Sequence, residues 1–404
     1  MKKSILLILI LTGFSCQQNT EEMTYPVTQK IPVSETYFDT EVTDNYRWLE
    51  DDMSKETEAW VGKQNETTFS FLDQIPFRSE LKNRLEQIWN YEKLSAPFKE
   101  GDYTYFYKND GLQNQYVVYR QKEGEGEEKE VFLDPNTFAE DGTTSLAGLT
   151  FSKSGKLAAY SISEGGSDWR KIIVLDAVHK TILEDTLLEV KFSGIQWKLD
   201  EGFFYSSYDK PDGSELSEMT DQHKLYYHKL NTSQKTDKLV FGGAIKRRYV
   251  GGSVSEDENY LFISAANSTS GNELYYLDLS TPNSKIVTLI DNYENDNDVL
   301  DNKGSKIYLV TNFNAPNKRV VTFDLSNPKK ENWKDCIAET ENVLSPNTGS
   351  GYIFASYMKD AVSFIKQYDY NGKLVRDVQL PGVGSAGGFG GKEKETTLYF
   401  SFTN

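Results

Sequence analysis

The feature that most constrains the fold is a repeat of short strands that runs through most of the chain. In each repeat a polar turn rich in Asp, Glu, Gly or Lys precedes an aromatic and aliphatic strand. Seven such segments begin 43 to 57 residues apart. They are "EGDYTYFYK" (100–108), "SKSGKLAAYS" (152–161), "KLDEGFFYSS" (198–207), "SEDENYLFIS" (255–264), "DNKGSKIYLVT" (301–311), "GSGYIFASY" (349–357) and "KEKETTLYFSF" (392–402). A unit of this length holds four short strands and their turns, which is one blade of a β-propeller.

A second type of strand, which ends in Asp, lies between these segments. Its examples are "IIVLD" (172–176), "LYYLDL" (274–279), "VVTFDL" (320–325) and "FIKQYDY" (364–370). Two strand types in each period favour a propeller over a two-sheet sandwich. The sequence therefore predicts a mostly β fold, a seven-bladed β-propeller over residues 93–404. The chain ends on an apolar strand at "ETTLYFSFTN", so we expect the last blade to be incomplete, with its remaining strands beyond residue 404.

The helical part of the chain is expected before the propeller, within residues 54–92. Ser54 is a suitable N-cap for a helix that runs to about Leu72, and Ser79 for a second helix. The second helix carries a one-sided apolar stripe, formed by Leu81, Leu85, Ile88 and Trp89. Trp60 and Trp89 are expected to be core residues, because large aromatic side chains in helices more often pack in a core than bind ligands.

The N-terminus has the layout of a secretory signal peptide. In "MKKSILLILILTGFSC" (1–16) two lysines precede a short apolar run, which is too short to span a membrane. Cys16 follows small residues, and residues 17–24 form a polar tether, so we predict a lipoprotein signal with Cys16 as the lipidated residue; ordinary signal cleavage is the alternative. The protein would then be exported in a bacterium, periplasmic or anchored to the membrane through lipid alone.

Charge and cysteine content exclude several classes of function. The formal net charge of −17 argues against nucleic-acid binding, which needs Lys and Arg to face phosphates. Only one cysteine, Cys336, accompanies Cys16, so a lipidated Cys16 would leave no intramolecular disulfide. The chain has no CxxC, HExxH or EF-hand spacing. We therefore predict neither a metal site nor a cofactor.

The sequence contains no recognisable set of catalytic residues. No G-x-S-x-G nucleophile elbow is present, and the chain has only three histidines, His179, His223 and His228. His223 and His228 are five residues apart on an expected strand, so they should point to opposite faces and share no proton relay. All three are expected to be structural. A propeller enzyme with its own central site is disfavoured too, because no motif clusters carboxylates or histidines.

Several longer motifs resemble those of the prolyl oligopeptidase family of serine peptidases. They are "DNYRWLED" (44–51), "YFYKNDGLQNQYVVY" (105–119), "FLDPNTFAEDGTTSLAGLTFSKSGKLAAYSISEGGSDWRKIIVLD" (132–176), "QHKLYYHKLNT" (222–232), "YLVTNFNAPNKRVVTFDL" (308–325) and "LPGVGSAGGFGGKEKETTLYFSFT" (380–403). The likeness runs in order from about residue 25 to the last residue.

The resemblance implies a propeller inserted into an α/β-hydrolase domain. Residues 25–92 would be a short helical segment that packs on the hydrolase domain, and the Ser, Asp and His of the triad would lie beyond residue 404. The complete protein would be a monomer that hydrolyses short peptides after proline, with the propeller gating access. This chain alone is then expected to be inactive. The alternative is a stand-alone propeller that binds peptides or a partner protein.

The resemblance also implies roles for four propeller residues. Asp168 would pair with an arginine of the hydrolase domain, and Trp169 lies beside it. Phe192 would line the substrate pocket, with Val250 near another lining position. From the residues alone, Asp168 could equally be a turn residue and Phe192 a core residue.

Overall fold

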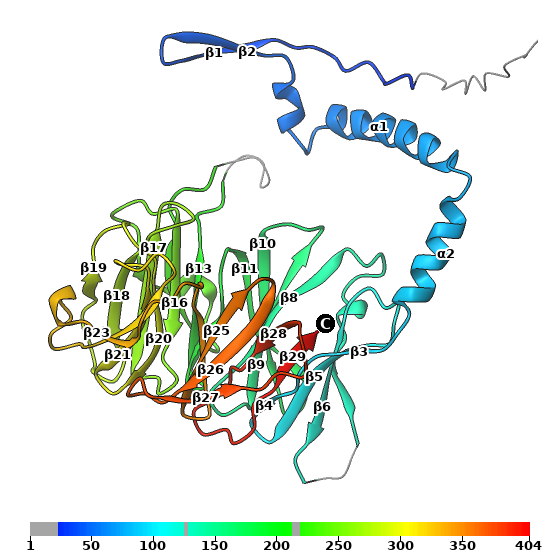
Figure 1. Ribbon diagram of the computed structural model, residues 1–404. Helices are drawn as coiled ribbons and strands as arrows, with labels where there is room; N and C mark the ends of the chain where they lie inside the picture. The colour runs from blue at the N-terminus through cyan, green and yellow to red at the C-terminus, as the bar shows by residue number, and fades with distance from the viewer. Residues whose placement is uncertain (1–22, 125–127, 212–218) are drawn as a thin grey trace, which may run out of the picture. The chain divides into compact units, whose positions relative to one another are not determined.

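The computed structural model describes residues 23–124, 128–211 and 219–404 (Figure 1). The chain divides into two compact units, Met1–Leu85 and Glu86–Asn404. The predicted signal peptide and Cys16 lie outside the described residues. None of the helices in the described ranges is long and apolar enough to cross a membrane.

A hairpin and two helices precede the propeller. Their bounds are β1 (Val33–Tyr37), β2 (Thr40–Asp44), η1 (Arg47–Glu50), α1 (Lys55–Asp73) and α2 (Arg78–Trp89). Ser54 caps α1 as predicted, because its hydroxyl accepts the Thr57 N–H at 3.1 Å. The predicted cap at Ser79 is wrong, since α2 begins at Arg78 and Ser79 lies inside it.

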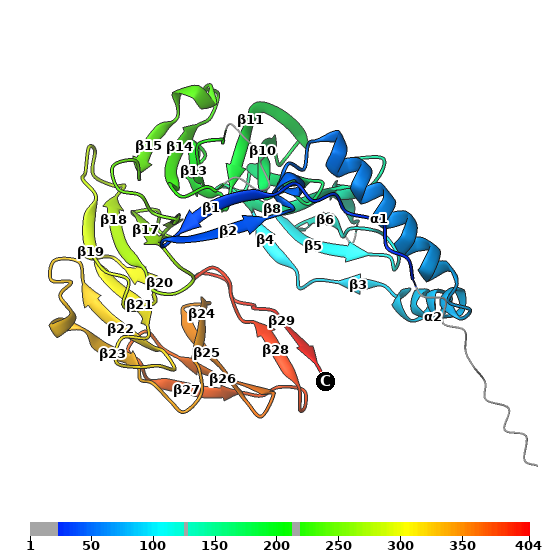
Figure 2. The same cartoon turned by 90° about the horizontal axis from the view of Figure 1, so that it is seen from above.

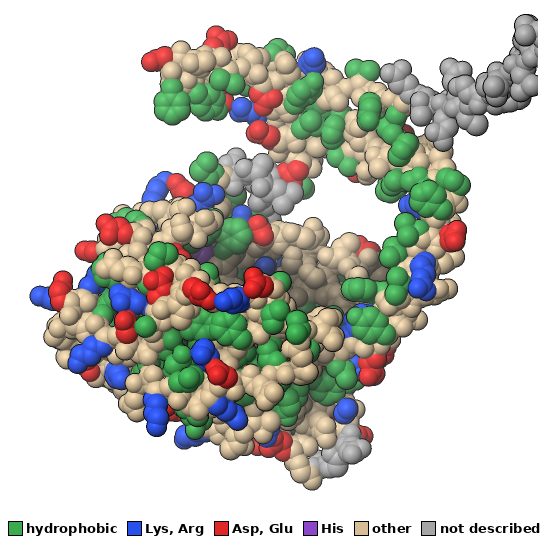
Figure 3. Space-filling view, viewed as in Figure 1, with side chains coloured by type: hydrophobic (Ala, Val, Ile, Leu, Met, Phe, Trp, Pro, Cys, Tyr) green, Lys and Arg blue, Asp and Glu red, His purple; other side chains and the backbone are tan. Residues whose placement is uncertain are grey.

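The apolar stripe of α2 is exposed. Leu81, Leu85, Ile88 and Trp89 are 51 to 63% accessible to solvent. Figure 3 shows hydrophobic side chains along both helices. Trp89 is therefore not a core residue in this chain, contrary to the general expectation for a helical tryptophan. Trp60 is only partly buried, and its indole N–H donates to the Thr28 hydroxyl at 3.0 Å.

In the described part of residues 93–404, six antiparallel sheets of four or more strands and one two-stranded sheet are arranged around a common centre (Figure 2). The first sheet consists of β3 (Lys93–Leu94), β4 (Phe98–Glu100), β5 (Tyr103–Asn109), β6 (Val117–Lys122) and β7 (Glu130–Leu133). The second consists of β8 (Thr144–Phe151), β9 (Leu157–Glu164), β10 (Trp169–Asp176) and β11 (Thr181–Lys191). The third consists of β12 (Gln196–Lys198), β13 (Gly202–Ser207), β14 (Lys224–Lys229) and β15 (Lys238–Phe241). The fourth consists of β16 (Tyr249–Val254), β17 (Tyr260–Ala266), β18 (Glu273–Asp278) and β19 (Val287–Ile290), and the fifth of β20 (Asn297–Lys303), β21 (Lys306–Thr311), β22 (Arg319–Asp324) and β23 (Lys334–Ile337). The sixth consists of β24 (Ser345–Gly349), β25 (Tyr352–Lys359), β26 (Val362–Tyr368) and β27 (Leu374–Val378). The last consists of β28 (Ser385–Gly388) and β29 (Phe400–Thr403). Short 3₁₀ turns, η2 (Pro135–Thr137), η3 (Gln234–Thr236) and η4 (Lys330–Asn332), lie in the connections.

The predicted repeat corresponds to one position in each sheet. All seven predicted segments overlap the strand that is second in the order of its sheet, from β5 in the first to β29 in the last, and the Asp-terminated segments overlap third strands. The described residues thus confirm a β-propeller. They form six blades rather than the predicted seven, because the seventh segment belongs to a sheet of only two strands. We call the six larger sheets blades 1 to 6.

The aspartates that end the third strands have a local cause. Each carboxylate accepts the backbone N–H two residues further on, which closes an Asx turn toward the fourth strand. The pairs are Asp176 with Val178 (2.8 Å), Asp278 with Ser280 (2.8 Å), Asp324 with Ser326 (2.9 Å) and Asp369 with Asn371 (2.9 Å). The repeated Asp is therefore a turn signal, repeated because the blade is repeated.

The hydrophobic core lies between neighbouring blades. Tyr105 and Val118 of blade 1 share one cluster with Ala158 of blade 2. Ile172 and Leu187 of blade 2 share another with residues of blade 3. The inner strand β13, for example, is buried along its whole length.

Candidate functional site

The connections between strands separate into two ends of the propeller. In an antiparallel four-stranded blade, the turns from first to second and from third to fourth strand lie at one end. The other end holds the connections from second to third strand and from each blade to the next. Exposed apolar side chains gather on those connections, and we call this the apolar end: Leu112, Tyr116, Phe192, Ile245, Val343 and Val383, which are 41 to 76% accessible.

Charged side chains meet at the opposite end. The Lys392 ammonium lies 2.6 Å from the Glu100 carboxylate, which joins the last sheet to blade 1. The Glu393 N–H donates to Glu256 of blade 4 at 2.9 Å, and the Glu393 carboxylate pairs with Lys303 of blade 5 at 2.9 Å. The first-to-second turns of separate blades therefore contact one another at this end.

Phe192 lies at the apolar end, in the connection from blade 2 to blade 3. It follows β11 directly, is 45% exposed and has a φ of +51°, a left-handed conformation that costs a side-chain-bearing residue about 1–3 kcal/mol. Its ring centroid lies 6.2 Å from that of Tyr208 and 6.1 Å from that of Tyr249. Phe192 is therefore not a core residue; surrounding contacts hold it in a strained, exposed position.

The lysine that precedes Phe192 has its ammonium group near two aromatic rings, those of Phe192 and Trp169. The ammonium of Lys191, a largely buried side chain, is 5.3 Å from the Phe192 ring centroid and 5.0 Å from that of Trp169. These distances are in the range of cation–π attraction. We call Lys191, Phe192, Trp169, Tyr208 and Tyr249 the Phe192 cluster. It combines the exposed ring of Phe192 with a largely buried positive charge.

The other predicted site residues, Asp168, Trp169 and Val250, lie in or beside blades 2 and 4. Asp168 is exposed on the connection from β9 to β10, at the apolar end, and the buried Trp169 begins β10. Val250 also lies next to the cluster, but its side chain packs in the core with Phe204 and Leu261. The predicted roles of Asp168 in pairing with an arginine, and of Phe192 and Val250 in lining a pocket, stay predictions.

His223 contacts the backbones of both Lys191 and Val250. Nothing in the sequence indicated this role for His223. Its Nε2 lies 2.9 Å from the Lys191 carbonyl oxygen, and its Nδ1 lies 2.9 Å from the Val250 amide nitrogen. The ring is buried and stacks on Tyr208 with centroids 4.2 Å apart. Burial lowers the pKa of His223 to about 4, so the ring is neutral at pH 7.

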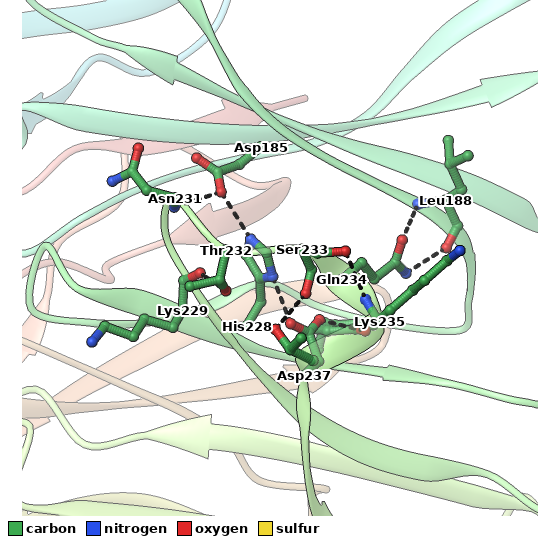
Figure 4. A network of polar contacts seen from close by, with 12 residues as sticks. Asp185, Leu188, His228, Lys229, Asn231, Thr232, Ser233, Gln234, Lys235 and Asp237 are labelled. Carbon is green, nitrogen blue, oxygen red and sulfur yellow. Dashed lines mark hydrogen bonds and ion pairs between the residues drawn. The ribbon is translucent and has the colours of Figure 1, made fainter.

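His228 also contacts β11, inside a network of polar contacts (Figure 4). Its Nδ1 is 2.8 Å from Asp237 Oδ1 and its Nε2 is 3.2 Å from Asp185 Oδ1 of β11. Both rings contact β11, His223 at Lys191 and His228 at Asp185. His223 precedes β14, so strand alternation does not govern it. No local signal in the sequence predicts either contact.

Other groups give no sign of chemistry in the described ranges. His179 is exposed and its Nδ1 lies 2.9 Å from Asp176. No group of three or more His, Cys, Asp or Glu side chains in this part of the chain could hold a metal ion. Cys336 is partly buried, and burial raises the pKa of its thiol. A hollow of about 310 Å³ lies against Ser363 and Val378, and none of the Phe192 cluster lines it.

Comparisons with known proteins agree with this architecture. Residues 25–404 match the family model described as "Prolyl oligopeptidase, N-terminal beta-propeller domain". The prolyl endopeptidase of Elizabethkingia meningoseptica is 57% identical over 389 residues, which are 96% of this chain and 55% of that protein. The prolyl endopeptidase of Dictyostelium discoideum is 29% identical over 429 residues, 90% of this chain and 56% of that protein.

Solved structures show the same fold. Prolyl oligopeptidase B from Galerina marginata, bound to a 35mer hydrolysis and macrocyclization substrate, has a TM-score of 0.82 and 30% identity, and the match covers 94% of this chain and 57% of that one. The chain thus spans about half the length of the relatives that it matches. It belongs to the prolyl oligopeptidase family, whose N-terminal β-propeller domain it carries.

Proposed function

We propose that this chain is the propeller portion of a prolyl oligopeptidase-like serine endopeptidase that cleaves short peptides after proline. The observation that carries the proposal is the Phe192 cluster, in which an exposed aromatic ring lies beside a largely buried lysine ammonium at the apolar end of a propeller from this family. Proline rings pack on aromatic faces, and a buried lysine can attract the carboxylates or carbonyl groups of a peptide. The catalytic Ser, Asp and His would be supplied by sequence beyond residue 404, together with the remaining strands of a seventh blade.

Two exposed apolar surfaces support a further domain. Exposed apolar patches mark interaction surfaces, and this chain has such residues both on α2 and at the apolar end. We infer that residues 25–92 and the apolar end each face the additional length that the relatives have. Asp168, exposed at that end, would pair there with an arginine, and the propeller would gate access to the catalytic groups.

The proposal predicts that residues 1–404 alone have no peptidase activity. Acyl transfer needs a nucleophile, a base to activate it and an oxyanion hole. In the described ranges the three histidines contact carboxylates or backbone groups instead: His179 contacts Asp176, His223 two backbone groups, and His228 two aspartates.

A chromogenic Gly-Pro amide tests this directly. The purified 404-residue chain should release no chromophore, whereas a chain extended to the relatives' length should. Turnover that stays with the 404-residue chain through successive purification steps would overturn the proposal. The same assay with Phe192→Ala in the extended chain should raise KM, because a substrate-lining ring is lost.

A stand-alone binding module is the second candidate, and the Phe192 cluster favours it equally if no further domain exists. Calorimetry with a short proline peptide distinguishes the two. Micromolar binding by a monomeric 404-residue chain, abolished by Phe192→Ala, would favour the module. Light scattering during gel filtration gives the oligomeric state, for which we propose a monomer.

We also propose export and lipidation at Cys16, on the basis of the N-terminal sequence alone. Metabolic labelling with an alkyne fatty acid should mark the wild-type protein in a bacterial membrane fraction. Cys16→Ser should lose the label. Label on both proteins, or on neither, would contradict lipidation at this residue.

A further inference from the structure

Two histidines of blade 3 contact the last strand of blade 2 at two points, and their surroundings require opposite protonation states. His223 lies between a backbone acceptor, the Lys191 carbonyl, and a backbone donor, the Val250 N–H, both at 2.9 Å. Only the neutral ring with its proton on Nε2 satisfies both, because it donates from Nε2 and accepts at Nδ1. A protonated His223 would set an N–H against the Val250 N–H.

His228 lies between two acceptors. Asp237 Oδ1 is 2.8 Å from Nδ1 and Asp185 Oδ1 is 3.2 Å from Nε2, and the side chains of all three residues are 1 to 2% exposed. A neutral ring has one N–H, so one buried carboxylate would face a nitrogen lone pair. The imidazolium donates to both and neutralises part of their charge. These hydrogen bonds raise the pKa of His228 above its usual value, although burial works in the opposite direction.

In the part of the chain that the structure describes, no other cationic side chain joins this network. From β13, the Tyr205 hydroxyl donates to Asp237 Oδ2 at 2.9 Å and the Phe203 ring lies beside the imidazole, with centroids 5.4 Å apart. The Asn231 N–H donates to Asp185 Oδ1 at 2.7 Å, and Asp185 Oδ2 is buried with no hydrogen-bond partner in the described ranges. The lysines in Figure 4, Lys229 and Lys235, join it through backbone atoms. The imidazolium is thus the positive charge at the centre of the network.

We propose that His223, held neutral, and His228, held protonated, form a two-point clamp that fixes β11, and with it Lys191 and Phe192, against the next two blades. We call this pair the histidine clamp. Asp185 lies in the middle of β11, and Lys191 is its last residue. The clamp therefore holds both the strand and the strained residue that follows it. Val250 ties the same point to blade 4, so three blades meet at His223.

The clamp has a pH window that follows from its geometry. The pKa of His223 is lowered to about 4, so its contribution is complete above the unfolded value of about 6.5 and is lost as pH falls through about 4. The pKa of His228 is raised, so its contribution is complete below about 6.5 and is lost as pH rises through its folded value. At low pH the clamp weakens at the His223 contact, at the end of β11. At high pH it weakens at the His228 contact, in the middle of β11.

NMR of the 404-residue chain labelled with ¹⁵N-histidine tests the protonation states. At pH 6.5 the two ring nitrogens of His228 should both have imidazolium shifts, while His223 should show the neutral Nε2–H tautomer. His223→Gln and His228→Gln assign the signals, and the exposed His179 serves as the internal reference. A neutral His228 or a charged His223 at this pH would overturn the proposal.

Hydrogen exchange tests the positioning role. His223→Leu should speed exchange of the Val250 amide and of amides in residues 190–194 at least tenfold, whereas His223→Gln should restore much of the protection because an amide can donate and accept. His228→Gln should speed exchange along β11 but preserve the Val250 amide. The matched control, His179→Gln, should change neither segment. Unchanged protection in His223→Leu would refute the clamp.

The value of the clamp for peptide binding rests on the proposed function, whereas its protonation states do not. If the proposed function is correct, His223→Leu should weaken peptide binding or raise KM in the extended chain at least fivefold, and His223→Gln should largely rescue it. If the NMR shifts and exchange rates agree with the clamp but binding does not change, the proposed role of Phe192 fails and the clamp stands.

Discussion

Arg120 provides the sharpest test of how the blades are joined. It lies in β6 of blade 1, with its side chain only 3% exposed. Its guanidinium donates to the carbonyl oxygens of Ala177 and Val178, which follow the third strand of blade 2. It also contacts the Glu130 carboxylate at 2.6 Å and lies 4.1 Å from the Tyr103 ring centroid. One side chain thus satisfies two carbonyls of the neighbouring blade.

The two members of this ion pair should differ strongly in their effect on stability. Arg120→Ala removes a buried cation, leaves two carbonyls without their donor and opens a cavity, so it should lower the free energy of unfolding by about 3–5 kcal/mol. Glu130 is 44% exposed, and an exposed ion pair contributes about 0–1 kcal/mol. Glu130→Ala should therefore cost less than about 1 kcal/mol, although it also removes the contact with Lys180 at 2.6 Å.

Urea unfolding followed by far-ultraviolet circular dichroism measures both values on the 404-residue chain. Equal m-values show that the two variants unfold from comparable native states. Arg120→Lys is the matched control for charge: it retains the cation but not the fork of donors, so its cost should lie between the other two. If Arg120→Ala and Glu130→Ala agree within about 0.5 kcal/mol, the backbone contacts contribute nothing and the argument is refuted.

Two further predictions use matched sites. Gly155 and Gly304 both have a positive φ in turns between the first and second strands of a blade. A Cβ atom added to Gly155 would lie 2.3 Å from the Gly101 backbone nitrogen, whereas a Cβ atom added to Gly304 would have no neighbouring atom of the described residues within 4 Å. Gly304→Ala should cost about 1–2 kcal/mol for its backbone conformation, and Gly155→Ala about 1–3 kcal/mol more; equal midpoints in urea would contradict this. Ile88→Ser, on the exposed face of α2, should change the stability of this chain by less than about 0.5 kcal/mol. In a chain extended to the relatives' length it should cost about 1.5–3 kcal/mol, and calorimetric melting of both chains measures the difference.

The sequence predicted those parts of the fold that depend on local chemistry. The strand period, the Asp near the end of four third strands and the Ser54 cap all arise from residues close together in the chain, so each leaves a local pattern. The Ser79 cap failed at the same scale, because helix ends vary by one or two residues with little change in energy. The blade count went further than local patterns allow: the second strand of the last sheet was found, but a strand does not reveal how many neighbours it has.

The candidate site was only partly predictable, because its contacts join distant residues. Phe192, Asp168 and Val250 came from a resemblance, which places residues but not their surroundings. It gave no indication that the Val250 side chain would be buried while its amide donates to His223. His223 and His228 both contact β11 of the neighbouring blade, and a strand pattern contains no information about which blade a side chain will meet.

The position of the Phe192 cluster follows from how a propeller is built. The last strand of a blade is its outermost, and the next blade begins with its innermost strand, so each connection must cross the sheet edge from outside to inside. This crossing segment has no strand partner of its own, and its backbone groups need partners from elsewhere. At Lys191 the partner is a side chain of blade 3 that also accepts from blade 4. A residue with positive φ at such a crossing costs free energy, and it persists where contacts from several blades offset that cost, which explains why Phe192 can be both strained and exposed. It follows that the site is a property of at least three assembled blades, and that changes far from Phe192 that loosen these junctions should alter it.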